Sequence, residues 1–182
     1  MISDSIFKAY DVRGLYPQEL DEETARIIGA ALAQQLGASV LGAGMDPRPS
    51  SRGLLDAFAA GAATCGAETV DFGLVPTEML YFGVASRGLG GGAMVTASVN
   101  PPQYNGMKLV GAGALPLSGD AGIPELRQRC QSMASYSESG SSKLSTFASS
   151  SVTNSLTNAK DRGLILSTRL RPASASWVTP SW

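Results

Sequence analysis

The first 130 residues of the chain predict an α/β fold whose sheet has a parallel core. Two observations support this prediction. Short apolar segments alternate with longer segments of helical periodicity, as in repeated strand–helix units. Polar clusters also follow three of the short segments, and active-site groups gather beyond the carboxyl ends of parallel strands. The connections between parallel strands should be right-handed crossovers.

Three helices are expected in this region. Asp21 can cap the first helix, and Gly37 can end it. The second helix can begin at Ser50 or Ser51, and the third covers residues 78–85. Apolar residues have helical spacing at Ala25, Ile28, Leu32 and Leu36 in the first helix, and at Leu54, Leu55, Phe58, Ala62 and Cys65 in the second.

Strands are expected at residues 39–41, 68–72, 92–96 and 104–110, and a further strand should end near residue 8. Each of these segments is short and bounded by glycine, proline or other turn residues. The predicted strands therefore supply the alternation with helices from which the α/β class follows.

The composition excludes several classes of function. The chain has 182 residues and a formal net charge of −1, which gives no electrostatic reason to expect a nucleic-acid or anionic-membrane partner. It has neither an apolar run of about 20 residues nor a signal-peptide pattern at its start, so a cytoplasmic protein is expected. The absence of histidine excludes Ser-His-Asp catalysis and histidine metal sites.

The sequence changes character near residue 130. Residues 131–182 contain 15 serines and only 2 of the 21 glycines, and they show no sustained helical or alternating pattern. This composition predicts a disordered, low-complexity tail after a domain of residues 1–130. The tail is either a natural extension or the product of a shifted reading frame after about Arg129; the abrupt end of the pattern favours the second.

The first polar cluster is the segment of residues 8–14, which contains Lys8, Asp11 and Arg13 at the expected exit of the first strand. The planar guanidinium group of arginine suits the binding of phosphate. An Asp–Arg pair of this kind can equally be a structural ion pair.

The second polar cluster spans residues 44–51, where a strand leads through a glycine turn to Arg48 and a helix start. Free backbone N–H groups at a helix N-terminus favour an anion. The alternative is ordinary capping of that helix by Ser50.

The third cluster, residues 96–108, is the most informative. Small residues before Ser98 allow it to be exposed at a strand end, and two turns can bring Lys108 back toward it. A hydroxyl near an ammonium group is suited to holding a phosphoryl group. The alternative is a turn-rich loop that Asn105-Gly106 closes.

These clusters resemble the motifs of the α-D-phosphohexomutase (phosphomannomutase/phosphoglucomutase) family. Thr96 to Lys108 resembles the motif TASHNPxxxNGxK, Lys8 to Gly14 resembles KAYDIRG, and Asp46 to Ser51 resembles RDxRxSS. The three motifs occur in the family's order, and the resemblance covers about residues 5–129. It implies the first domain of that family: three α/β/α layers with a mostly parallel, mixed sheet of four strands.

The resemblance also implies a chemistry. Ser98 would be the phosphoserine that exchanges its phosphoryl group with a hexose phosphate, moving phosphate between the 1- and 6-positions through a bisphosphate. Lys108 and Arg13 would assist catalysis. Mg²⁺ would bind an oxygen of the phosphorylated Ser98, and a hexose bisphosphate would be the activator. The residues that match positions for binding substrate or phosphate are Tyr10, Lys8, Arg48 and Asn100.

Several departures from the family pattern limit this implication. Val99 stands where the family usually has histidine, and Met45 stands where arginine is common. A DGDGDR-type metal loop, the sugar-selecting loop and the last domain's phosphate-binding loop do not occur in the sequence. We therefore expect a fragment that lacks domains two to four and is inactive alone. The alternatives are a stand-alone sugar-phosphate binding module and a non-functional product. The identity of the hexose is not indicated.

Overall fold

The structure, a computed structural model, describes residues 2–138. The predicted Ser-rich tail lies outside the described residues from position 139 onward. Within residues 2–138, no helix is both long enough and apolar enough to cross a membrane.

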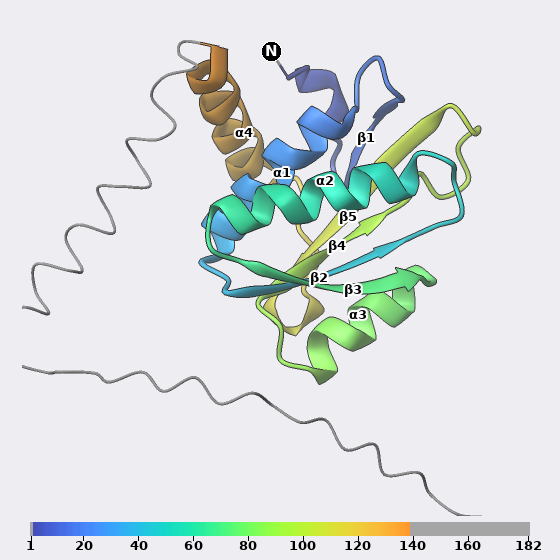
Figure 1. Cartoon of the computed structure of the whole chain (residues 1–182), viewed down its shortest axis with the longest axis vertical. Coiled ribbons are helices and arrows are strands. Elements are labelled where there is room, and N and C mark those ends of the chain that lie inside the picture. Colours follow the sequence, from blue (N-terminus) through green and yellow to red (C-terminus); the bar gives the residue numbers. More distant parts are fainter. Residues whose placement is uncertain (1, 139–182) are drawn as a thin grey trace, which may run out of the picture. The chain divides into compact units, whose positions relative to one another are not determined.

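The centre of the domain is a mixed sheet of five strands in the order β1-β5-β4-β2-β3 (Figure 1). Strand β2 pairs in parallel with β3 and β4, and β5 is antiparallel to both β4 and β1. The strands are β1 (Val12–Leu15), β2 (Val40–Met45), β3 (Glu68–Leu74), β4 (Gly91–Val95) and β5 (Tyr104–Gly111). The expected mixed sheet and its parallel core are confirmed.

The sheet has five strands, one more than the four that the family resemblance implied. The additional edge strand, β1, has only four residues, too few to show an alternating pattern in the sequence. It begins at Val12, so the segment of residues 8–11 precedes a strand and does not follow one as predicted. Phe7 pairs with Val12 in an isolated bridge, and the backbone N–H of Lys8 donates to the carbonyl of Asp11 at 2.8 Å. Residues 8–11 therefore form a turn that leads into β1.

Helices cover both faces of the sheet, as the three-layer prediction requires. They are α1 (Glu22–Leu36), α2 (Ser51–Thr64), α3 (Thr77–Ser86) and α4 (Ile123–Glu138). Helices α1 and α2 lie on one face, and α3 lies on the other (Figure 1). The Asp21 carboxylate accepts from the Thr24 N–H at 2.8 Å at the start of α1, and Gly37 ends this helix with φ of 57°. Both predicted boundaries of α1 are confirmed.

Helix α4 was not predicted, and it continues past residue 130. It packs against α1, and its Leu126 and Cys130 side chains are fully buried in the main core. The change in composition near residue 130 therefore falls within a helix. Cys65 is less buried than predicted. It was expected on the apolar face of α2, but it is exposed because α2 ends at Thr64, one residue before it.

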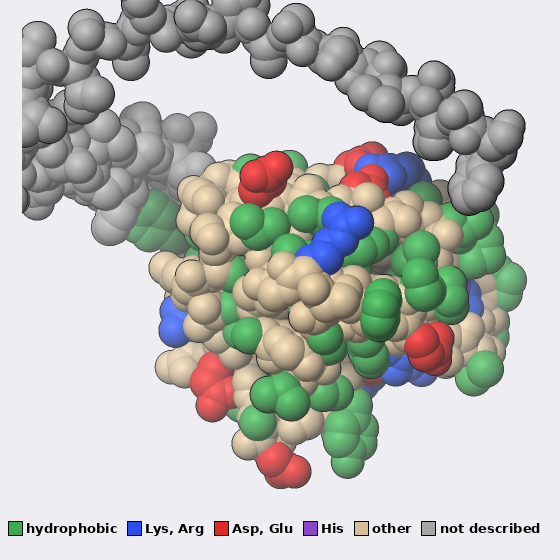
Figure 2. Space-filling model, turned by 90° about the horizontal axis from the view of Figure 1, so that it is seen from below, with side chains coloured by type: hydrophobic (Ala, Val, Ile, Leu, Met, Phe, Trp, Pro, Cys, Tyr) green, Lys and Arg blue, Asp and Glu red, His purple; other side chains and the backbone are tan. Residues whose placement is uncertain are grey.

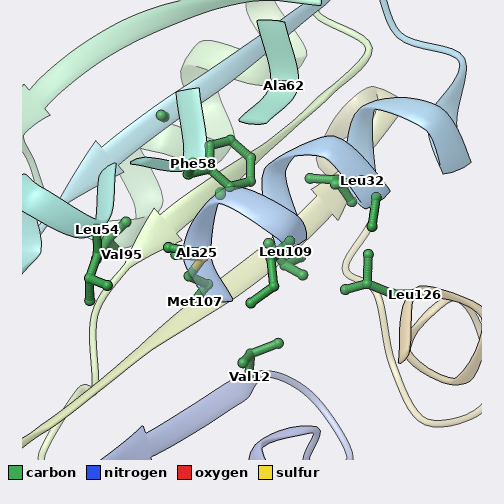
Figure 3. Close-up of a cluster of buried hydrophobic side chains, with 14 of the residues drawn as sticks. Val12, Ala25, Leu32, Leu54, Phe58, Ala62, Val95, Met107, Leu109 and Leu126 are labelled. Carbon is green, nitrogen blue, oxygen red and sulfur yellow. The ribbon is translucent and has the colours of Figure 1, made fainter. Parts of the chain in front are cut away.

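The main hydrophobic core lies between the sheet and the helices α1 and α2 (Figure 3). Side chains from both layers, including Leu32, Leu54, Phe58, Val95 and Met107, have no measurable exposure. A smaller cluster under α3 contains Leu80, Val84, Met94 and Val110. The two clusters cover opposite faces of the sheet.

Helices α1 and α2 contact each other closely through two glycines. A Cβ atom at Gly29 would lie 2.0 Å from the carbonyl oxygen of Phe58, and one at Gly61 would lie 1.8 Å from that of Arg26. Only glycine allows the backbones of the two helices to approach this closely.

The surface formed by α3 and the end of β3 is partly apolar. Leu74, Met79 and Phe82 expose 63%, 51% and 66% of their surface. Figure 2 shows this side of the molecule, where apolar side chains are interspersed with charged ones.

Candidate active site

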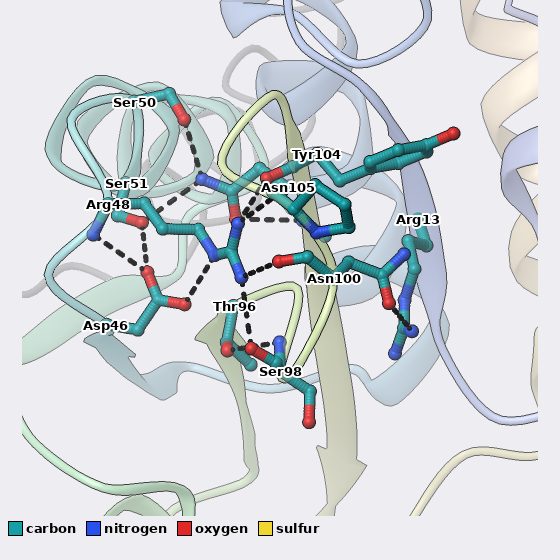
Figure 4. Close-up of polar contacts among 12 residues, drawn as sticks. Arg13, Asp46, Arg48, Ser50, Ser51, Thr96, Ser98, Asn100, Tyr104 and Asn105 are labelled. Atoms are coloured by element: carbon teal, nitrogen blue, oxygen red, sulfur yellow. Dashed lines mark hydrogen bonds and ion pairs between the residues drawn. The ribbon is translucent and has the colours of Figure 1, made fainter.

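The Ser98 loop, residues 96–104, follows β4 and precedes β5. Ser98 is exposed and has φ of 55°, in the left-handed region. Its backbone N–H donates to the Thr96 hydroxyl oxygen at 2.9 Å, and the Asn100 N–H donates to the Ala97 carbonyl at 3.1 Å. The Ser98 hydroxyl points away from this network (Figure 4) and makes no hydrogen bond within the described part of the chain. The loop thus presents a free hydroxyl to solvent.

Arg48 contacts the side of this loop that carries its backbone carbonyls, away from the Ser98 hydroxyl. Its Nε donates to the Asp46 carboxylate at 3.0 Å, and its two terminal nitrogens donate to four backbone carbonyls (Figure 4). These carbonyls belong to Ser98 (3.0 Å), Asn100 (2.7 Å), Pro101 (2.8 Å) and Tyr104 (3.0 Å). A guanidinium group has five N–H donors, and all five are used here. No donor of Arg48 therefore remains for a phosphate oxygen in this arrangement, and binding of phosphate by Arg48 stays a prediction.

Asp46 is the anion that balances Arg48. Its carboxylate also accepts from the Ser51 hydroxyl at 2.6 Å and from the Arg48 backbone N–H at 3.2 Å. Burial alone would raise the pKa of the Asp46 carboxyl, but hydrogen bonds from Ser51, Thr96 and Arg48 outweigh burial and lower this pKa. Asp46 is therefore held as a carboxylate, and it connects the start of α2 to the Ser98 loop.

Asn105 makes the second connection between α2 and the loop. Its side chain is fully buried, and its amide donates to the hydroxyl oxygens of Ser50 at 2.8 Å and Ser51 at 3.1 Å. The Ser50 side chain makes no capping hydrogen bond to α2. The predicted capping by Ser50 is thus corrected: its hydroxyl is an acceptor for Asn105.

Arg13 and Lys108 flank one buried carboxylate. Arg13 donates to the Asn100 side-chain oxygen at 2.8 Å and to the Asp11 carboxylate at 2.5 Å. The Lys108 ammonium lies 3.9 Å from the same carboxylate oxygen. Two cations share one anion, so this side of the loop carries an excess positive charge. The Asp11–Arg13 ion pair, raised in the sequence analysis as a structural alternative, is present, and Arg13 also contacts the Ser98 loop through Asn100.

The structure does not bring every predicted residue into this group. The Lys108 ammonium contacts Asp11, and its connection to Ser98 is indirect, through Arg13 and Asn100. The Lys8 ammonium donates to the backbone carbonyl of Ser5. The Tyr10 side chain is 73% exposed. Lys8 and Tyr10 thus lie outside the network that holds the Ser98 loop.

Comparison with known proteins shows the family of this chain. The family model described as phosphoglucomutase/phosphomannomutase, alpha/beta/alpha domain I, matches residues 4–136. A phosphohexose mutase of Xanthomonas campestris is 49% identical over 121 residues, which cover 66% of this chain and 27% of that protein. The chain belongs to the phosphoglucomutase/phosphomannomutase family.

A second sequence relative and a solved structure also match this chain. A phosphomannomutase of Salmonella montevideo is 43% identical over 122 residues, which cover 67% of this chain and 27% of that protein. The crystal structure of a phosphoglucomutase/phosphomannomutase family protein from Burkholderia thailandensis matches with a TM-score of 0.68 at 36% identity, covering 74% of this chain and 31% of that chain. The chain thus spans about 27% of the length of these sequence relatives.

The described part of this phosphohexomutase domain does not supply a complete metal site. Residues 2–138 contain no group of three or more Asp, Glu, Cys or His side chains that could hold a metal ion. The two carboxylates nearest the Ser98 loop, Asp11 and Asp46, are already paired with arginines. An open hollow of about 460 Å³ next to the loop is lined by Asp46, Thr96 and residues 74–78.

Sequence reasoning missed the supporting residues of this domain. Thr96, Asp46 and Asn105 were within the motifs, but no role was assigned to them. Asn105 was taken only as a turn residue before Gly106. Its position opposite Ser50 and Ser51 could have been inferred if the end of β2 and the start of β5 had been expected to lie at the same edge of the sheet.

Proposed function

We propose that this chain is the serine-bearing domain for phosphohexomutase-type phosphoryl transfer, which moves phosphate between the 1- and 6-positions of a hexose. Ser98 donates its phosphoryl group to a hexose phosphate, and the resulting bisphosphate returns its other phosphoryl group to Ser98. The observation that carries the proposal is the exposed, unbonded hydroxyl of Ser98 at the end of β4.

The charges around the loop support this chemistry. In the first step, the bond between phosphorus and Ser98 Oγ breaks and a bond forms between phosphorus and a sugar hydroxyl oxygen. The proton that the sugar hydroxyl loses is balanced by the proton that Ser98 Oγ gains as it leaves as a free hydroxyl. Phosphoserine carries a charge of about −1.5 to −2 near neutral pH. Phosphoryl transfer depends chiefly on positioning and on stabilising such charge. Arg13 and Lys108, which share only the Asp11 carboxylate, are the cations proposed for this role.

Magnesium and a hexose bisphosphate activator remain part of the proposal. When bound, Mg²⁺ would neutralise phosphate charge, with an oxygen of phosphorylated Ser98 as one ligand. The described residues do not provide the other ligands, so they would come from elsewhere in a longer protein.

A chimaera tests the proposal. Residues 4–136 would replace the matching segment of the Xanthomonas campestris phosphohexose mutase, so that the rest of the relative completes the site. We expect conversion of glucose 1-phosphate to glucose 6-phosphate that Ser98→Ala abolishes. Ser86→Ala, which changes an exposed serine at the end of α3, is the matched control and should leave the rate unchanged. A chimaera that stays active with Ser98→Ala, or is inactive with Ser98 present, would contradict the proposal.

A further inference from the structure

We propose that Arg48 and Asp46 form a clasp that positions the Ser98 loop, and that Arg48 is a positioning residue without direct contact to phosphate. The purpose of the clasp rests on the proposed function of Ser98, but its existence does not.

All five N–H donors of Arg48 are used to hold the loop and Asp46. One guanidinium group binds four carbonyls of the loop, from residues 98, 100, 101 and 104, at 2.7 to 3.0 Å. Its fifth donor is held by Asp46 at 3.0 Å. A single rigid fork thus fixes the direction of four peptide groups. Since these carbonyls point toward Arg48, the Ser98 side chain is left on the opposite, solvent side, as Figure 4 shows.

The backbone of Ser98 provides the reason for such a clasp. Among the described residues, only Ser98 and Ala114 have positive φ without being glycine. A left-handed conformation is unfavourable for an L-residue other than glycine. It persists only where the surroundings enforce it. The Ser98 N–H is held by Thr96 and its carbonyl by Arg48, so both peptide groups that flank its φ and ψ angles are fixed.

The two arginines near the loop, Arg13 and Arg48, differ in how their positive charge is neutralised. Arg48 is neutralised by Asp46, whose side chain is only 16% exposed, and the Arg48 side chain is 13% exposed. Arg13 shares its carboxylate with Lys108 and lies beside the Asn100 side chain. The excess positive charge is therefore near Arg13 and Lys108, whereas the clasp is neutral and its donors are used.

Hydrogen exchange of individual amides, measured by NMR on the whole 182-residue chain without phosphate, tests the clasp. Arg48→Lys keeps the positive charge but loses the fork of five donors. We expect the amides of Ser98, Asn100 and Tyr104 to exchange faster by about tenfold or more, with the amides of β2 unchanged. Arg52→Lys is the matched control, because Arg52 lies in the first turn of α2, four residues after Arg48, and pairs with Asp56 and Asp71 away from the loop.

Two further measurements distinguish a clasp from a general contribution to stability. Asp46→Asn should also accelerate exchange in the loop while the amides of β2 remain protected. In Arg48→Ala, added ethylguanidinium at non-denaturing concentration should restore protection of the loop, whereas loss of general stability would not be restored. The clasp is disproved if Arg48→Lys retains wild-type loop exchange, or if loop and β2 amides accelerate together. None of these readouts depends on phosphoryl transfer.

Discussion

Asn105 illustrates how single residues determine the geometry of the site. The buried side-chain amide nitrogen of Asn105 donates to two serine hydroxyls at the start of α2. Its side-chain oxygen, Oδ1, accepts from the Gly106 N–H at 2.8 Å. Asn105→Ala removes these three hydrogen bonds and leaves the buried Gly106 N–H without its side-chain acceptor, so we expect the free energy of unfolding to fall by about 1–3 kcal/mol. Urea denaturation checks this. Gln103→Ala, at an exposed position of the Ser98 loop two residues before Asn105, should change the free energy of unfolding by less than about 0.5 kcal/mol.

The ionisation of Asp46 predicts a dependence on pH. Its pKa is lowered in the folded chain from an ordinary value of 3.8, because the hydrogen bonds to the carboxylate outweigh its burial. The unfolded chain thus binds more protons in acid. The stabilisation is present above the unfolded pKa and is lost as pH falls through the folded one.

We therefore expect the free energy of unfolding to decrease as pH falls from about 5 to about 2, and to decrease less in Asp46→Asn. Asp21 and Glu19 also have lowered pKa values, so only the difference between the two proteins reports on Asp46. Equal decreases in the two proteins would contradict the assignment. The measurement is chemical denaturation at a series of pH values.

At the scale of the elements, the crossing of α1 and α2 depends on backbone contact. A methyl group at Gly61 would meet the Arg26 carbonyl at 1.8 Å, so Gly61→Ala must separate the helices. We expect a loss of about 2 kcal/mol or more in thermal or urea unfolding.

Gly53 provides the matched control, since it lies in the same helix. The nearest atom to a Cβ there is the flexible carboxylate of Glu22, at 2.9 Å. Gly53→Ala should be neutral or stabilising by up to about 1 kcal/mol, because alanine favours helix. Equal losses for the two variants would show that helix propensity, and not the crossing, decides the effect.

The elements that could be predicted are those whose sequence pattern is local. The capped ends of α1 and its apolar spacing identify it directly, and β5 was expected within one residue of its observed end. Strand β1 was misplaced because four residues carry no periodicity, and its position depends on pairing with β5. Helix α4 was missed although its buried residues Ile123, Leu126, Cys130 and Ala134 have helical spacing, because the serine-rich composition after residue 130 predicts a tail.

The same distinction applies to the site. The exposed Ser98 could be predicted from a motif in one short segment. The role of Arg48 could not, because four of its five partners are backbone carbonyls more than 49 residues away, and any sequence supplies carbonyls. The position of Lys108 beside Asp11 likewise depends on how β1 and β5 pair.

At the scale of the whole molecule, the described domain supplies the serine, two cations and their supporting network. It spans about 27% of the length of its sequence relatives and has no complete metal-binding cluster within residues 2–138. We expect the 182-residue chain alone to show no steady conversion of glucose 1-phosphate to glucose 6-phosphate. The assay includes Mg²⁺ and a hexose bisphosphate, and sustained turnover would refute this expectation.

The electrostatic environment of a phosphate on Ser98 is the most direct test of the account. Phosphoserine would be introduced at position 98 during translation and titrated by ³¹P NMR, with phosphoserine at position 86 as the reference. If Arg13 and Lys108 stabilise the dianion, the second pKa of the phosphate at position 98 should lie below the ordinary value of about 6 and rise in Lys108→Gln. A pKa equal to that of the reference and unchanged in Lys108→Gln would contradict the account.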